Sequence, residues 1–178
     1  MADFYAGIGS RKTPADVLVL MERIAVKLRQ EGWTLRSGHA PGADQAFERG
    51  AAGYAEIFLP WEGFEANVGV MGKVYTHAPA RAYELAEHFH PAWDRCSQGA
   101  RRLHARNCQQ IYGPTCNGAS TTTSFVICWS NGTGGTEQAL RIATAERIPI
   151  TNLFSAETRE DAEKWLAGEP IELGQKLR

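Results

Sequence analysis

Three glycine-bearing turns hold the residues of this sequence that could bind an anion. Their segments are Gly7-x-Gly9-Ser10-Arg11, Gly38-His39-Ala40-Pro41-Gly42-Ala43-Asp44 and Gly132-Thr133-Gly134-Gly135-Thr136. Glycine lets the backbone approach a ligand closely, and the amides at a helix start attract negative charge. Ser10 and Thr136 add hydroxyl groups, and Arg11 adds a guanidinium suited to phosphate. A single turn of this kind also fits a purely structural role, but three of them together predict an anion site.

The turns follow segments with the composition of strands and precede segments with helical periodicity. Helices are expected over residues 14–31, 43–52, 79–89, 92–112, 136–147 and 161–166, and residues 61–78 are expected to form a loop. The expected strands are Phe4–Ile8, Trp33–Arg36, Ala55–Pro60, Ser124–Trp129 and Ile148–Leu153. The strand ending at Trp129 is apolar on both faces, which is typical of a buried central parallel strand.

This alternation predicts one α/β domain over residues 1–178, with a mostly parallel sheet and helices on both of its faces. The core should run from about residue 4 to 153, with a short helical tail after it. Ligands of such sheets bind beyond the carboxyl ends of the strands. We therefore expect the three turns to meet at one edge.

Composition excludes several classes of protein. The net charge is −1, so no global attraction to nucleic acid or membrane is expected. Neither a leader peptide nor a membrane span is predicted, and we expect a cytoplasmic protein with four reduced cysteines. The first turn is no GxGxxG fingerprint, because residue 12 is lysine, and no Walker A loop occurs. A dinucleotide oxidoreductase and a P-loop nucleotidase are therefore disfavoured, and no cofactor is expected.

Histidine and cysteine do not form a metal-binding pattern in the sequence. His88, His90, His104 and Cys108 invite such an interpretation, because His104 and Cys108 are four residues apart. However, no compact third and fourth ligand accompanies them, so no metal site is predicted.

The combined motifs resemble a known superfamily. The segments are YAGIGSRKTP, LRSGHAPGADQAFERGA, IFLPW, ARNCQQIYG and FVICWSNGTGGTEQALRIA. They are similar to the Rossmann-like superfamily that joins the DNA-processing protein A (Smf) proteins to the Lonely Guy phosphoribohydrolases, above all to small stand-alone members frequent in phages. A phage protein would act in the host cytoplasm.

The resemblance implies a Rossmann-like fold and a nucleotide or nucleotide-derived ligand. It also implies a possible homo-oligomer. Its motifs assign the phosphate to Gly7, Gly9, Ser10, Arg11, Gly134, Gly135 and Thr136, and the base or ribose to Gly38, Gly42, Ala43 and Asp44.

Two activities follow from the two branches of this superfamily. Lonely Guy enzymes use a glutamate on the ribose, but here the position three after Thr136 is Ala139, and the nearest acid is Glu137. N-glycosidic hydrolysis with Glu137 and Arg106 as catalytic residues is one hypothesis. The alternative is a protein that binds single-stranded DNA or a recombination partner through the basic stretch 95–106.

Three residues of this proposed site have structural interpretations as well. Asp44 could contact ribose or cap its helix, and Glu137 could act in catalysis or only complement the helix dipole. Trp61 could stack on a base or simply cover the sheet. Asn107, which is not assigned to the site, lies at an otherwise apolar helical position and needs a polar partner, which a ligand or a neighbouring backbone could supply.

Overall fold

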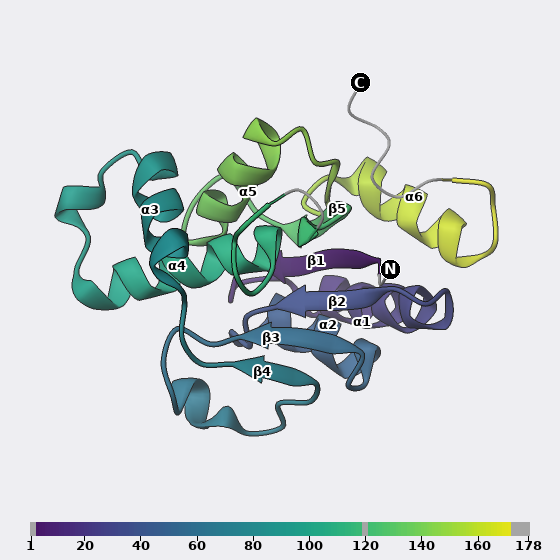
Figure 1. Cartoon of the computed structure of the whole chain (residues 1–178). Helices are drawn as coiled ribbons and strands as arrows, with labels where there is room; N and C mark the ends of the chain where they lie inside the picture. The colour runs from purple at the N-terminus through teal and green to yellow at the C-terminus, as the bar shows by residue number, and fades with distance from the viewer. Residues whose placement is uncertain (1–2, 119–120, 172–178) are drawn as a thin grey trace.

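The computed structural model describes residues 3–118 and 121–171. It has six parallel strands in the order β4-β3-β2-β1-β5-β6 (Figure 1). The strands are β1 (Phe4–Gly9), β2 (Thr34–Ser37), β3 (Ala55–Phe58), β4 (Lys73–Tyr75), β5 (Phe125–Trp129) and β6 (Ile150–Asn152). The expected single α/β domain with a parallel sheet is confirmed.

Helices cover both faces of this sheet. They are α1 (Ala15–Gln30), α2 (Ala43–Ala51), α3 (Ala80–Phe89), α4 (Gln98–Tyr112), α5 (Thr136–Ala145) and α6 (Ala156–Leu166). The helices α1, α2 and α6 contribute to one buried apolar cluster, and α3, α4 and α5 contribute to the other. Side chains along β5 point alternately to the two faces of the sheet. Ile127 and Trp129 therefore belong to the first cluster, and Val126 and Cys128 belong to the second.

The strand order reverses direction at β1. The chain moves outward from β1 through β2 and β3 to β4, and then returns to place β5 on the opposite side of β1 (Figure 1). The connection after β1 therefore runs to β2 on one side, and the connection after β5 runs to β6 on the other side. In such sheets a crevice forms between two strands whose connections diverge. This point of the sheet positions the site described below.

Two expectations about the elements were wrong. Residues 61–78 contain β4 and a 3₁₀ turn, Phe64–Asn67, rather than loop alone. β4 was not predicted because it is only three residues long. It also lies at the edge of the sheet, where its side chains are largely exposed and no apolar run is needed. The predicted helix over 92–112 is interrupted: a 3₁₀ turn, Trp93–Arg95, precedes α4, and Cys96 and Ser97 have extended backbones.

None of the helices in the described ranges combines the length and apolar character that a membrane span requires.

Candidate functional site

A cleft of about 650 Å³ opens beside the carboxyl ends of β1 and β5, where the strand order reverses. All three predicted turns contribute to its wall. The lining includes Gly9, Ser10, Arg11 and Lys12 from the turn after β1, Ala40 and Asp44 from the turn before α2, and Thr133, Gly134, Gly135 and Thr136 from the loop before α5. Arg11 and the Gly134–Thr136 segment therefore border one cavity, as we expected if the turns meet at one edge of the sheet.

Hydrogen bonds to the β1 end hold the first turn in place. The Ser10 amide donates to the Trp129 carbonyl at 3.1 Å, and Ser10 Oγ accepts from the Lys12 amide at 3.0 Å. Gly9 leaves no room for a side chain, because a Cβ there would lie 2.6 Å from Ala43 Cβ and 3.0 Å from the Trp129 oxygen. Glycine thus brings the α2 start, β1 and β5 close together under the cleft.

The loop before α5 presents a helix start to the cleft. Gly134 has φ of 91°, a conformation that favours glycine, and α5 begins at Thr136 without a side-chain cap. The start of a helix carries a partial positive charge that attracts an anion. The amides of Glu137 and Gln138 themselves donate to the carbonyls of Gly134 and Gly135 at 3.3 Å. Asn107 Nδ2 donates to the Gly135 oxygen at 2.9 Å, which fixes the loop against α4. The polar partner that Asn107 needs is therefore this backbone carbonyl.

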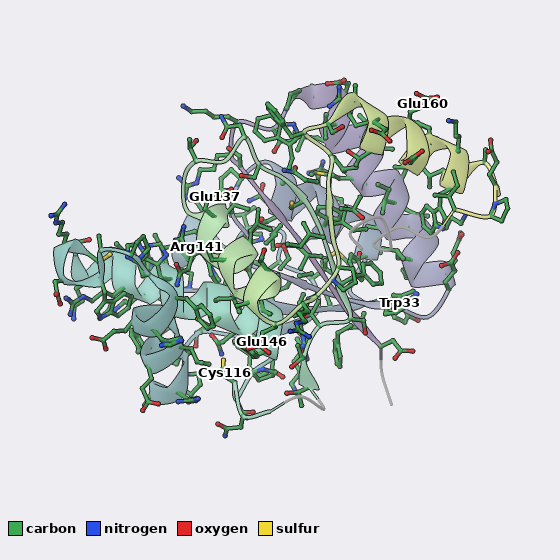
Figure 2. All side chains as sticks on the ribbon, turned by 90° about the horizontal axis from the view of Figure 1, so that it is seen from above. Trp33, Cys116, Glu137, Arg141, Glu146 and Glu160 are labelled. Carbon is green, nitrogen blue, oxygen red and sulfur yellow. The ribbon has the colours of Figure 1, made fainter. Side chains whose placement is uncertain are left out.

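The cleft wall is strongly cationic. Arg11, Lys12, Arg106 and Arg141 line it, and Asp44 is the one carboxylate among the described lining residues. Arg11 is exposed at the rim, where its Nη2 pairs with Glu65 at 2.9 Å. Arg141 lies one helical turn after Glu137 on α5 (Figure 2). This excess of positive charge suits a ligand with more than one negative charge.

Asp44 and Arg106 form a buried ion pair in this wall. Arg106 Nη1 lies 3.3 Å from Asp44 Oδ2, and the two side chains are 7% and 4% exposed. Asp44 also accepts from the amides of Gly9 at 3.2 Å and Ala40 at 3.4 Å. Burial raises the pKa of Asp44, against the opposing effects of Arg106 and these amides, and burial lowers the pKa of Arg106. Asp44 therefore orders the wall and joins three elements.

Gln110 and Gly38 complete the surroundings of Arg106. With its amide oriented to satisfy both groups, Gln110 accepts from Arg106 Nη1 at 3.3 Å and from the Gly38 amide at 3.1 Å. A Cβ on Gly38 would lie 1.2 Å from Arg106 Nη1. Gly38 thus makes room for the guanidinium, a role that its place in a glycine-bearing turn did not reveal.

Several of the predicted site residues lie behind the cleft. Gly7 is packed on Phe47, since a Cβ there would be 2.6 Å from Phe47 Cγ. Gly42, with φ of 94°, lies against the backbone of Ser10 and Arg11, and Ala43 is fully buried. These residues, like Gly38, shape the turns and are not among those that line the cleft.

Glu137 and Trp61 also lie outside the described lining. The Glu137 carboxylate accepts a hydrogen bond from Ser130 Oγ at the end of β5. Trp61 makes an edge-on contact with Phe64, with ring centroids 5.3 Å apart, and packs against the core on the α1–α2 face. The structure therefore unites most of the predicted phosphate site, but not the predicted catalytic acid or the predicted stacking residue.

The sequence motifs did not indicate several residues that line the cleft, among them Lys12, His90, His104, Gln110 and Arg141. Burial lowers the pKa of His104 to about 4, with further effects from His90, Arg141 and Arg106. Burial and then Arg141 also lower the pKa of His90. Both imidazoles are therefore neutral near pH 7. Lys12 adjoins the predicted turn, but no local pattern could place the others.

Comparisons with known proteins agree with this fold. No protein-family model and no curated sequence matches the chain. DNA processing protein A from Helicobacter pylori, described for its single-stranded DNA binding mode, is 18% identical with a TM-score of 0.59, covering 92% of this chain and 73% of its own. The Chlamydomonas rheinhardtii Moco carrier protein is 14% identical with a TM-score of 0.53, covering 94% and 86%. The Rossmann-like, DNA-processing-protein-A-like fold is thus shared with these proteins.

Proposed function

We propose that this protein binds a nucleotide or a nucleotide-derived small molecule in the cleft between β1 and β5. One observation carries the proposal: the turn after β1, the uncapped start of α5 and four cationic side chains surround a single cavity of about 650 Å³. That volume is within the range of small-molecule pockets. The phosphate would lie between Ser10 and Gly134–Thr136, within reach of the cations.

The two catalytic residues suggested by the sequence receive unequal support for N-glycosidic hydrolysis. Arg106 lines the cleft, whereas the Glu137 carboxylate is bonded to Ser130 outside the described lining. Asp44, the lining carboxylate, is engaged by Arg106 and two amides. We therefore propose binding as the function. Incubation with a bound nucleotide and chromatography of the free base would test hydrolysis, and Glu137→Ala should leave any release rate unchanged.

Binding of single-stranded DNA is the second candidate, favoured by the structural likeness to DNA processing protein A. The basic stretch 95–106 gives it little support as one surface. Arg101 stacks on Trp93 at 5.1 Å, Arg106 is buried in the cleft wall, and Arg95 and Arg102 are exposed. Only part of the stretch is therefore available to a polyanion, and we rank the small ligand first.

A thermal-shift screen over mono-, di- and cyclic nucleotides tests the proposal directly. A ligand at 100 times its Kd should add about 2.7 kcal/mol to the free energy of unfolding and raise the Tm accordingly. Arg141→Gln should weaken binding of the strongest ligand by at least about tenfold, because the variant removes a charge-assisted contact to phosphate.

Arg147→Gln is the matched control, since Arg147 is exposed at the far end of the α5 segment and should leave the affinity unchanged. No stabilisation by any nucleotide, together with oligonucleotide binding that falls steeply with salt, would favour the DNA alternative. Equal losses in Arg141→Gln and Arg147→Gln would place the ligand elsewhere.

A further inference from the structure

Two histidines and a cysteine from three segments meet at the mouth of the cleft. His90 follows α3, Cys96 follows the 3₁₀ turn Trp93–Arg95, and His104 lies on α4. Their candidate ligand atoms all lie within 4.8 Å of one another. The segment between α3 and α4 folds back on itself, so residues up to fourteen positions apart in the sequence form one cluster.

The distance between the Cys96 and His90 donor atoms is close to that of two ligands on one tetrahedral metal ion. Zn–S bonds of about 2.3 Å and Zn–N bonds of about 2.1 Å, at a tetrahedral angle, separate sulfur and nitrogen by about 3.6 Å. Cys96 Sγ lies 3.7 Å from His90 Nδ1 and 3.7 Å from His90 Nε2. The ring centroids of His90 and His104 are 4.4 Å apart. Small side-chain rotations would therefore bring three donors onto one ion.

The candidate ligand atoms make few hydrogen bonds to the rest of the described chain. His104 Nδ1 is buried and has no hydrogen-bond partner within the described residues, which is costly for an imidazole nitrogen. His90 Nδ1 accepts from the Ala92 amide at 3.1 Å, a bond that coordination through Nδ1 would replace. Cys96 Sγ makes only a long contact of 3.6 Å to the Ala92 carbonyl besides its contacts with His90.

We propose that His90, Cys96 and His104 bind one Zn²⁺ ion, with the fourth coordination position open toward the cleft. Two imidazoles and a thiolate are donors that Zn²⁺ prefers, and three protein ligands are typical of sites that keep one position for water or substrate. Zn²⁺ binding converts the Cys96 thiol to a thiolate and releases its proton to solvent. His90 and His104 both line the cleft, so the open position faces the cavity.

The surrounding charge agrees with an anionic fourth ligand. Arg141 and Arg106 line the same cleft as His90 and His104. One thiolate neutralises only half of the charge on Zn²⁺. The ion and the two guanidiniums would together attract an oxygen of a phosphate or carboxylate. The site goes beyond the proposed nucleotide binding and does not depend on it, because the three protein ligands are present without a nucleotide.

Titration of the tag-free full chain with Zn²⁺ tests the site. We expect one Zn²⁺ per chain by calorimetry, and Co²⁺ as a spectroscopic probe should give the intense absorption of tetrahedral cobalt with a thiolate charge-transfer band. Cys96→Ser should abolish that band. It should also weaken Zn²⁺ binding by more than about 100-fold, since removing a ligand costs more than the roughly 10- to 100-fold lost when only a residue that orients a ligand is changed.

His88→Ala is the matched control, because His88 is exposed on the preceding turn of α3 and lies outside the cluster. It should bind Zn²⁺ like the unchanged chain. Circular dichroism would confirm that each variant is folded, and protection of Cys96 from alkylation by Zn²⁺ gives a second readout on the unchanged chain. Absence of stoichiometric uptake, or equal affinity and an unaltered cobalt spectrum in Cys96→Ser, would overturn the proposal.

Discussion

The buried pair of Arg106 and Asp44 shows how single residues shape this cleft. Two opposite charges that leave water together lose hydration, and hydrogen bonds to their remaining polar atoms offset that loss. Asp44 receives two backbone amides, and Gln110 accepts from Arg106. The printed contacts of Arg106 all use Nη1, and its buried Nε has no partner in the described chain.

Gly38→Ala should displace Arg106 and separate it from Asp44. The added methyl group overlaps Arg106 Nη1 rather than backbone, so the side chain has to move. We expect the free energy of unfolding to fall by about 3 kcal/mol, the usual cost of breaking a buried ion pair. Urea denaturation measures this change.

Gly99→Ala is the control for that experiment. Gly99 lies in the first turn of α4, and a Cβ there has no neighbour within 4 Å. Alanine favours the helix, so stability should stay the same or rise by up to about 1 kcal/mol. Equal stability of the two variants would show that Gly38 is not required for the ion pair.

At the scale of elements, α4 does most to convert the sheet edge into a site. It crosses the sheet on the face shared with α3 and α5 (Figure 1). It supplies His104, Arg106, Asn107 and Gln110 to the cleft. The residue at which α4 begins sets the helical phase of these side chains. Ser97 begins α4, with Oγ accepting from the Ala100 amide at 3.2 Å, and the extended backbone before it turns Cys96 toward His90.

Ser97→Ala should lower the free energy of unfolding by about 1 kcal/mol, because one of the free amides at the start of α4 loses its acceptor. Chemical denaturation monitored by circular dichroism measures this loss. The matched variant is Ser155→Ala at the start of α6, where the serine side chain makes no capping bond. That variant should change stability by less than about 0.5 kcal/mol. A similar loss in both would mean that the Ser97 hydroxyl contributes nothing specific.

At the scale of the whole molecule, the sheet and α2 enclose a second polar pair behind the cleft. Glu48 Oε2 lies 2.7 Å from His39 Nδ1, and the two side chains are 5% and 2% exposed. Burial raises the pKa of Glu48 from 4.5 to about 7, the nearby Asp44 charge adds to this rise, and the bond from His39 opposes it. Between pH 4.5 and about pH 7, Glu48 therefore keeps its proton in the folded protein and loses it in the unfolded chain.

The sign of this effect gives a pH dependence for the entire fold. Between pH 4.5 and about pH 7 the folded protein binds more protons at Glu48 than the unfolded chain, so its stability falls as pH rises. Glutamine at position 48 cannot ionise. Relative to Glu48→Gln, the free energy of unfolding of the unchanged chain should therefore fall by about 3 kcal/mol from pH 4.5 to about pH 7.

Urea denaturation of both proteins at a series of pH values measures the difference, in which the other titrations largely cancel. Glu48→Asn, with a shorter side chain, is the control for packing: it should lower stability by an amount independent of pH over the same interval. A difference between Glu48→Gln and the unchanged chain that stayed constant or grew in favour of glutamate would show that Glu48 is ionised in the fold.

Local patterns were sufficient for most elements of this protein. Apolar runs bounded by glycine and proline predicted five of the six strands, because a buried strand needs such a run whatever its neighbours. The three glycine-bearing turns at residues 7–11, 38–44 and 132–136 were predicted to meet because the carboxyl ends of parallel strands share one edge, and each of them contributes lining residues to the cleft. Three short features were not predicted: β4, the 3₁₀ turn Phe64–Asn67 and the break before α4, and α6 begins at Ala156, five residues earlier than predicted. Short segments lack a strong period.

Tertiary structure alone decided what each site residue does. Sequence spacing does not reveal that Gly38 makes room for Arg106, that Glu137 is bonded to Ser130, or that His90 and His104 meet. The direction of a side chain depends on how its helix packs over the sheet, and that packing joins residues far apart in the chain. The sequence therefore determined a parallel sheet whose glycine-bearing turns meet at one edge, while packing determined which side chains reach that edge.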